Sequence, residues 1–152
     1  MFNIKNILLP TDFSNLSLSA ARYAVDIAKQ YGAKVHLLNV LEKTPPILAI
    51  RSLDLSEEKI IKTIDDDAQN SLKKALEKIN QDKSVEIVPV IKKGVDFETI
   101  IEYSEANSID LIVIATHGRT GILHTLLGSV AEKVIRYAKC PVLVITPSET
   151  EK

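Results

Sequence analysis

Five short apolar runs alternate with helix-type patterns along the whole chain, and this alternation constrains the fold more than any other feature. The runs read "NILLP", "VHLLNVL", "EIVPVIKK", "DLIVIA" and "PVLVIT", and each has the length of a strand. Between them, apolar residues recur at the three- and four-residue spacing of a helix with one buried face. Such an order is typical of a parallel sheet with helices on both faces. We therefore predict an α/β fold with an open five-stranded parallel sheet.

Capping residues suggest where the helices begin and end. The first helix is expected to begin at Ser14 or Asn15 and to end before Gly32, which suits the position after a helix. A long amphipathic helix is predicted from Ser56 to about Asn80, and Asp96 can cap a shorter one.

One domain is expected to span residues 1–152, because the length is ordinary for a single hydrophobic core. The stretch 42–55 is predicted to be an irregular insertion, whose apolar residues would cover either the chain's own cleft or a partner. Residues 147–152 are expected to form a polar tail. Pro89 cannot donate to a strand ladder, so its strand is predicted to lie at an edge.

Charge and composition exclude several classes of function. The net charge is −1, so no general positive field attracts nucleic acid or anionic lipid. No apolar stretch approaches the roughly 20 residues that a membrane-spanning helix needs. Cys140 is the one cysteine, which fits a reduced compartment. We expect a cytoplasmic protein with neither a nucleic-acid nor a membrane partner.

Two polar loops follow the first and the fourth predicted strands. The first reads "PTDFS", and the second, "ATHGRTGILHTLLGS", holds three of the five glycines. In an open parallel sheet, ligands bind beyond the carboxyl ends of the strands, where the strand order switches. The first and fourth strands are the expected neighbours at that switch, so both loops are predicted to line one crevice.

The end of the glycine segment has the chemistry of an anion site. Gly128 and Ser129 precede a helix predicted over about 130–138, and the first amides of a helix have no partners within it. These amides and the helix dipole favour a phosphate, and His117 and Arg119 can add donors. The segment therefore indicates a polyphosphate site, although neither G-x-x-x-x-G-K-[ST] nor G-x-G-x-x-G is present.

A purely structural interpretation of the same residues stays open at this point. Ser129 and Glu132 form an S-x-x-E capping box, which needs no ligand. Gly118 can be a turn residue, and Asp12 can be a turn residue or bind ribose hydroxyls or a metal. The chain has no cluster of cysteine and histidine, so no metal site is predicted.

The two loops, with their flanking strands, resemble the universal stress protein family. The matching stretches are "NILLPTDFS" and "ATHGRTG…LLGSVAEKVIRYAKCPVLVI". The resemblance implies a Rossmann-like fold of the adenine nucleotide alpha hydrolase-like type. ATP-binding members of the family carry G-x2-G-x9-G-[ST]. Here Ala115 stands at the first glycine, followed by Gly118 and by Gly128 with Ser129.

This resemblance implies a cytosolic ATP-binding module for stress response or signalling, with Mg²⁺ carried by the phosphates. Asp12 would anchor the ribose, Val40 would offer its backbone to adenine, and residues 128–130 would hold the phosphates. The alternatives are an interaction module of the same fold that binds no nucleotide, and a slow ATPase; no catalytic residue is predicted. The residues expected at the nucleotide are Pro10, Thr11, Asp12, Val40, Ala115, His117, Gly118, Arg119, Gly128, Ser129 and Val130.

The family is commonly dimeric through its last strand, so a homodimer through Val142 and Val144 is expected. The alternative is a simple edge strand guarded by Pro141 and Pro147. For the phosphate site, Gly128→Val is expected to abolish ATP binding and to leave the fold largely intact.

Overall fold

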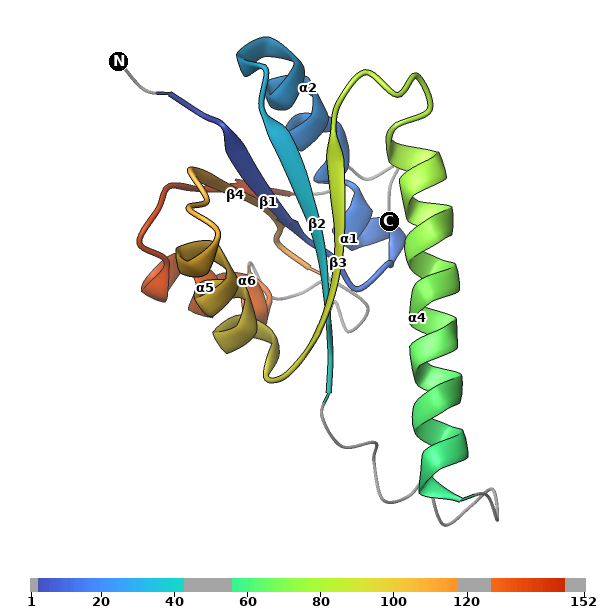
Figure 1. Cartoon of the computed structure of the whole chain (residues 1–152). Helices are drawn as coiled ribbons and strands as arrows, with labels where there is room; N and C mark the ends of the chain where they lie inside the picture. The colour runs from blue at the N-terminus through green and yellow to red at the C-terminus, as the bar shows by residue number, and fades with distance from the viewer. Residues whose placement is uncertain (1–2, 43–55, 118–126, 147–152) are drawn as a thin grey trace.

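The computed structural model describes residues 3–42, 56–117 and 127–146. A five-stranded sheet lies between two layers of helices (Figure 1). The elements are, in chain order, β1 (Asn6–Pro10), α1 (Asn15–Leu18), α2 (Ala21–Tyr31), β2 (Lys34–Leu41), α4 (Glu57–Ile79), β3 (Ile87–Lys93), α5 (Asp96–Ala106), β4 (Leu111–Ala115), α6 (Ser129–Tyr137) and β5 (Val142–Ile145).

The strand order is β3-β2-β1-β4-β5, and every neighbouring pair is parallel. The predicted fold class is confirmed, and so is the edge position of the strand that contains Pro89. The chain moves outward from β1 to β2 and β3, and then returns to β4 on the other side of β1. The order therefore switches at β1, between β2 and β4.

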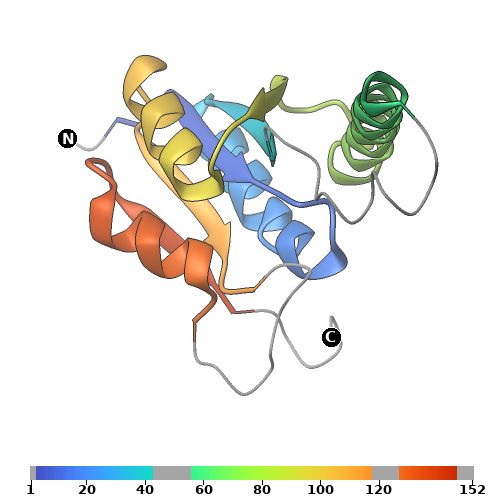
Figure 2. The ribbon, with the colours of Figure 1, turned by 90° about the horizontal axis from the view of Figure 1, so that it is seen from below.

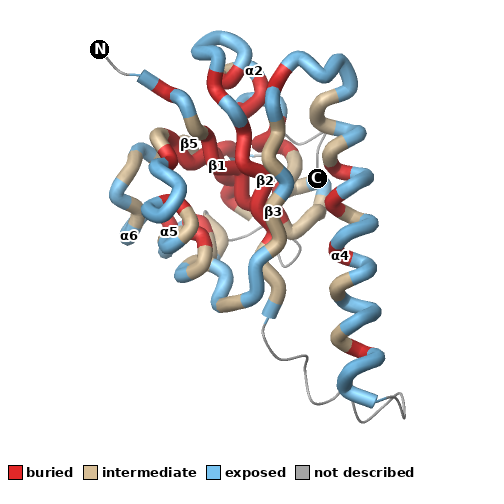
Figure 3. The backbone as a smooth tube through the Cα atoms, in the orientation of Figure 1, coloured by how far each residue is buried: buried red, intermediate tan, exposed pale blue. Residues whose placement is uncertain are grey.

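The central strands are buried on both faces, which explains their continuous apolar sequence. Ile7, Leu8 and Leu9 of β1 are fully buried, and Figure 3 shows the buried backbone concentrated in the middle of the sheet. Successive side chains of a strand point to opposite faces. Ile7 and Leu9 therefore belong to one core cluster, and Leu8 belongs to the other.

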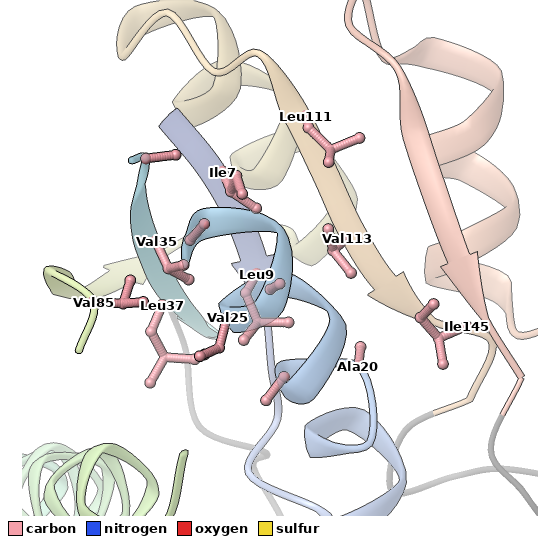
Figure 4. Packing of buried hydrophobic residues seen from close by; sticks show 14 of the residues in the cluster. Ile7, Leu9, Ala20, Val25, Val35, Leu37, Val85, Leu111, Val113 and Ile145 are labelled. Carbon is pink, nitrogen blue, oxygen red and sulfur yellow. The ribbon is translucent and has the colours of Figure 1, made fainter. Parts of the chain in front are cut away.

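Each core cluster belongs to one face of the sheet. On one face, strand residues such as Leu37 and Val113 belong to a cluster with Val25 of α2 (Figure 4). Leu72 of α4 belongs to the same cluster. On the other face, Leu38 and Ile114 pack with residues of α5 and α6. Seen along its axis, α4 stands beside the sheet, on the opposite side of the molecule from α5 and α6 (Figure 2). Helices therefore cover both faces, as predicted.

The first predicted helix is divided into α1 and α2. Ser14 caps α1, since its hydroxyl accepts a hydrogen bond from the Ser17 N–H at 3.1 Å. The Ser19 hydroxyl donates to the Leu16 carbonyl at 2.6 Å. Serine side chains compete with the backbone for such carbonyls, and this competition coincides with the interruption. Gly32 follows α2 with φ +65°, as its predicted role requires.

The predicted start of α5 needs a correction. Val95 is the N-cap, and Asp96 is already the first residue of the helix. Asp96 still stabilises the amino-terminal end of the helix, because its carboxylate accepts a hydrogen bond from the Phe97 N–H at 2.7 Å. Its negative charge also interacts favourably with the helix dipole there.

Two predicted segments fall largely outside the described residues. Of the insertion at 42–55, the structure describes Glu42 alone, and the tail at 147–152 is not described. Among the residues that are described, no helix combines the length and the apolar character needed to cross a membrane.

Candidate functional site

The carboxyl ends of β1, β2 and β4 meet the amino-terminal ends of α5 and α6 around one cavity of about 560 Å³. A cavity of this size falls in the range of small-molecule sites. It lies on the α5/α6 side of the sheet, at the switch in strand order. This is the place where open parallel sheets bind their ligands.

Nine of the eleven residues expected at a ligand line this cavity. Gly118 and Arg119, the other two, lie outside the described residues. The nine come from three strand ends, their loops and one helix start: Pro10, Thr11, Asp12, Val40, Ala115, His117, Gly128, Ser129 and Val130.

The cavity also has apolar lining residues that were not expected from the sequence. Leu38, Ile114 and Ile100 form part of its lining, and all three are buried. The two-residue period of a strand could have identified Leu38, because it shares a face with Val40. Ile100 comes from a different element, and no local pattern places α5 there. The remaining lining residues that were missed are Ser17, Asp96, Thr116, Leu127, Ala131 and Glu132.

The turn after β1 is held by a chain of hydrogen bonds through its own hydroxyls. The Phe13 N–H donates to Thr11 Oγ1 at 2.9 Å, and Thr11 Oγ1 lies 2.8 Å from Ser17 Oγ. Ser17 donates its own proton to the Ser14 carbonyl, so Thr11 is the donor in the Thr11–Ser17 pair. The hydroxyl proton of Thr11 is therefore used within the turn. Only the other atoms of Thr11 remain to contact a ligand.

Asp12 sits at the centre of this turn. Its Oδ1 accepts a hydrogen bond from the Ser14 N–H at 3.0 Å. Phe13, the next residue, has φ +65°, an unusual conformation for a bulky side chain. The surrounding hydrogen bonds fix this conformation, and with it the place of the Asp12 carboxylate at the cavity wall.

The backbone of Val40 reaches past the end of β1. In β2, even-numbered residues bond toward β1, as Lys34 N–H does to Lys5 and Leu38 carbonyl does to Thr11. Val40 therefore directs its N–H and carbonyl to the β1 side. The next bond of that ladder, from Val40 N–H to Thr11 carbonyl, is not formed in the described chain. Val40 lines the cavity, and among the described residues neither its N–H nor its carbonyl has a backbone partner on the β1 side.

The start of α6 differs from the predicted capping box. Gly128 is the N-cap, and Ser129 is the first residue of the helix. The first bond within the helix runs from the Glu132 N–H to the Gly128 carbonyl. The N–H groups of Ser129, Val130 and Ala131 therefore have no partner inside the helix. The capping-box interpretation is wrong, and three amide donors remain at the cavity.

Gly128 has a packing role of its own. Its N–H donates to the Thr116 carbonyl at 2.7 Å, and a Cβ atom at Gly128 would lie 2.5 Å from that same oxygen. Its φ of −72° is open to any residue. Glycine is required here because the backbones of the loop and the helix start approach each other closely.

Ala115 stands at the first glycine of the pattern G-x2-G-x9-G-[ST], and its environment is that of an ordinary strand residue. It ends β4 and pairs with Ile145 of β5. It is absent from the described residues with positive φ. The backbone at this position therefore accommodates alanine without strain.

Carboxylates dominate the charge of the described lining. Asp12, Asp96 and Glu132 contribute to the wall, and no lysine or arginine does among the residues that the structure describes. Histidine, cysteine and acidic residues form no group of three suited to a metal within the same residues. Donors for an anion therefore come from the backbone, with His117 beside them.

This fold and cavity define a class of protein: a doubly wound α/β chain whose cleft lies between a Thr-Asp turn and a Gly-Ser helix start. The family model described as the universal stress protein family matches residues 3–146. The chain belongs to this family.

Individual relatives agree with the assignment. Universal stress protein MJ0531 of Methanocaldococcus jannaschii is 39% identical over 147 residues, which cover 97% of this chain and 85% of the relative. The solved structure of MJ0577, from the same organism, has a TM-score of 0.77 at 28% identity and covers 96% of this chain and 98% of that one. A universal stress protein in complex with cAMP has a TM-score of 0.69 at 24% identity, covers 96% and 99%, and shows the fold.

Proposed function

We propose that this protein binds an adenine nucleotide in the cavity at the strand-order switch, with ATP carrying Mg²⁺ as its ligand. The observation that carries the proposal is that nine of the predicted residues, from segments far apart in the sequence, line one cavity. Its lining combines apolar side chains, the Asp12 carboxylate and, at the start of α6, amides without helical partners. These groups are complementary to the base, the ribose and the phosphates of an adenine nucleotide.

The base would lie against Leu38, Ile100 and Ile114, beside the backbone of Val40. Val40 offers a donor and an acceptor together. Adenine presents the acceptor N7 next to the donor N6, whereas guanine presents two acceptors on that edge. Val40 therefore favours adenine over guanine.

The phosphates would lie at the amino-terminal end of α6. Three N–H groups without helical partners, the helix dipole and the Ser129 hydroxyl all favour negative charge there. The carboxylate of Asp12 would accept hydrogen bonds from the ribose hydroxyls. Ala115, His117, Gly118 and Arg119 would complete the ribose and phosphate contacts.

Magnesium would supply charge that the described lining lacks. The wall holds three carboxylates and no lysine or arginine among its described residues, so an uncompensated triphosphate would be repelled. Mg²⁺ is bound mainly through substrate phosphates and one or two carboxylates. We therefore propose that Mg²⁺ enters with ATP rather than at a site of the protein's own.

The wider role that we propose is a cytoplasmic stress-response or signalling module. Nucleotide occupancy would set the conformation of the surface that contacts either another protein or a second copy of the chain, in a homodimer formed through β5. In β5, odd-numbered carbonyls accept bonds from β4, as those of Pro141 and Ile145 do. Val142 and Val144 therefore direct their backbone groups to the open edge. We propose no catalytic residue; multiple-turnover release of phosphate would favour a slow ATPase instead.

The proposal can be tested by removing one backbone donor. Ser129→Pro deletes the Ser129 N–H, and proline is well accepted at the first position of a helix. The preceding residue, Gly128, has ψ of 153°, which is compatible with a following proline. The matched control is Glu57→Pro, at the same position of α4, where Ser56 has ψ of 146°.

Calorimetric titration with Mg-ATP should show one saturable site in the unmodified protein. Ser129→Pro should weaken binding by about tenfold or more, as for the loss of a hydrogen bond to a charged group. Glu57→Pro should leave the affinity for Mg-ATP unchanged. EDTA should weaken the binding of ATP more than the binding of AMP. Equal affinity in both proline variants, or no heat at millimolar Mg-ATP, would refute the proposal.

A further inference from the structure

Asn39 is a buried amide next to Val40 that the site described above does not include. Only 4% of its surface is exposed. By strand alternation its side chain points to the same face as Leu37, away from the cavity. Its Nδ2 donates a hydrogen bond to the Thr11 carbonyl at 2.8 Å. Its Oδ1 is buried and has no hydrogen-bond partner in the described structure.

An amide in this position is costly to the fold. A buried polar atom without a partner loses its hydrogen bonds to water and gains none in return. A leucine has the same branching as asparagine and would belong naturally to the apolar cluster around Leu37. Among the described residues, the bond to the Thr11 carbonyl is the interaction that sets Asn39 apart from such a leucine.

That bond lies at the point where the β1–β2 ladder ends. Thr11 N–H still donates to the Leu38 carbonyl at 2.9 Å, so the ladder is intact up to this point. The next donor in register is the Val40 N–H, and the acceptor it would use is the Thr11 carbonyl. In the structure this carbonyl accepts from the Asn39 side chain, on the opposite face of the sheet, and not from the Val40 N–H.

We propose that Asn39 is a positioning residue for the nucleotide base. By holding the Thr11 carbonyl, it stops the β1–β2 ladder one bond early and leaves the Val40 N–H available to adenine. The same bond fixes the start of the turn that carries Asp12. This inference rests on the proposed function, and it adds a residue that lies outside the cavity.

The first arm of the test needs no ligand. In Asn39→Leu the Thr11 carbonyl is released, and the Val40 N–H can bond to it. Hydrogen exchange followed by NMR should therefore show the Val40 amide at least about tenfold more protected in Asn39→Leu than in the unmodified protein. Asn39→Asp, which keeps the shape and loses the donor, serves as a second variant if Asn39→Leu does not fold.

The second arm measures binding. ATP affinity should fall by about tenfold or more in Asn39→Leu, because the base loses one side of its paired contact. The preference for ATP over GTP should shrink with it. Affinity for tripolyphosphate with Mg²⁺, which has no base, should stay the same. A general loss of structure would instead lower the affinity for both ATP and tripolyphosphate.

Asn80 provides a matched control. Its Nδ2 also donates to a backbone carbonyl, that of Val85 at 2.8 Å, and its Oδ1 is also buried without a partner. It lies at the end of α4 and does not line the cavity. Asn80→Leu should leave the ATP to tripolyphosphate ratio unchanged.

Unchanged Val40 exchange, or equal losses for ATP and tripolyphosphate, would overturn the role of Asn39. Failure of the proposed function looks different, since the unmodified protein would then bind neither ligand. The exchange arm would still decide in that case whether Asn39 ends the ladder.

Discussion

The structure gives a packing reason for Gly128 that holds without any ligand. From the sequence, the glycine at this position was attributed to ligand binding. The expectation from sequence was that a side chain there would fill the phosphate space and spare the fold. In the structure, the nearest obstacle is the Thr116 carbonyl, 2.5 Å from a Cβ atom at Gly128. The expectation of an intact fold does not hold here, because a backbone carbonyl in a hydrogen bond cannot simply move aside.

We therefore predict that Gly128→Ala lowers the free energy of unfolding by about 1–3 kcal/mol, as is usual for overpacking. Urea denaturation of both proteins measures this difference. Nucleotide affinity should fall as well, since the shift moves the start of α6. A variant with unmodified stability would contradict the close approach of these two backbones.

Two serines at helix starts should behave in opposite ways. Ser14 is the N-cap of α1, and its hydroxyl accepts the Ser17 N–H. Ser14→Ala should cost about 1 kcal/mol of stability. Ser129 is the first residue of α6, and its hydroxyl makes no hydrogen bond within the described chain. Ser129→Ala should leave stability unchanged and weaken ATP binding. A loss of stability in Ser129→Ala would contradict this prediction and would favour the capping-box interpretation of Ser129.

At the scale of elements, the strands and the long helix follow from the sequence because their signals are local. Strands such as residues 111–115 are buried on both faces, and a continuous apolar run in the sequence predicts this burial. The interruption between α1 and α2 depends on which carbonyl each serine hydroxyl reaches. Spacing alone does not contain that information.

The edge of β5 yields a prediction about assembly. Val144→Pro removes an N–H that faces the open edge, and the bonds to β4 are retained. If the homodimer forms through this edge, light scattering should show the variant shifted toward the monomer mass. Leu143→Ile, on the same strand, is the control and should leave the mass unchanged. A dimer that persists in Val144→Pro would place the interface elsewhere.

Across the whole molecule, His36 links three elements and makes stability depend on pH. Its Nδ1 lies 2.8 Å from the Tyr103 hydroxyl of α5, and its Nε2 lies 3.4 Å from Asn6 Oδ1 of β1. Burial lowers the pKa of His36 below its ordinary value of 6.5; Lys34 adds to this effect and Glu86 opposes it.

The unfolded chain therefore binds a proton at His36 more readily than the folded one. Stability from this group is fully present above pH 6.5 and is lost as the pH falls below it. The free energy of unfolding should be lower at pH 5.5 than at pH 7.5. The difference should shrink in His36→Gln. Asp82, whose pKa the hydrogen bond from Lys29 lowers to about 2, titrates below this range. If the free energy of unfolding changed equally between pH 5.5 and pH 7.5 in the unmodified protein and in His36→Gln, the pH dependence would not come from His36.

The site itself was only partly predictable from the sequence. Thr11 could be named because it follows a recognisable strand and Ser129 because it begins a helix, whereas Val40, which lies inside β2, was implied by the family resemblance. Ile100 and Asn39 could not, since the first reaches the cavity from another layer and the second acts through the opposite face of the sheet. Contacts between elements determine both.

The most direct test of the central claim is an amide NMR spectrum of the labelled protein titrated with Mg-ATP. The account predicts saturable shifts at the amides of Val40, His117 and residues 128–130, with α4 unaffected. A spectrum unchanged at millimolar Mg-ATP, or shifts confined to residues outside the cavity, would contradict it.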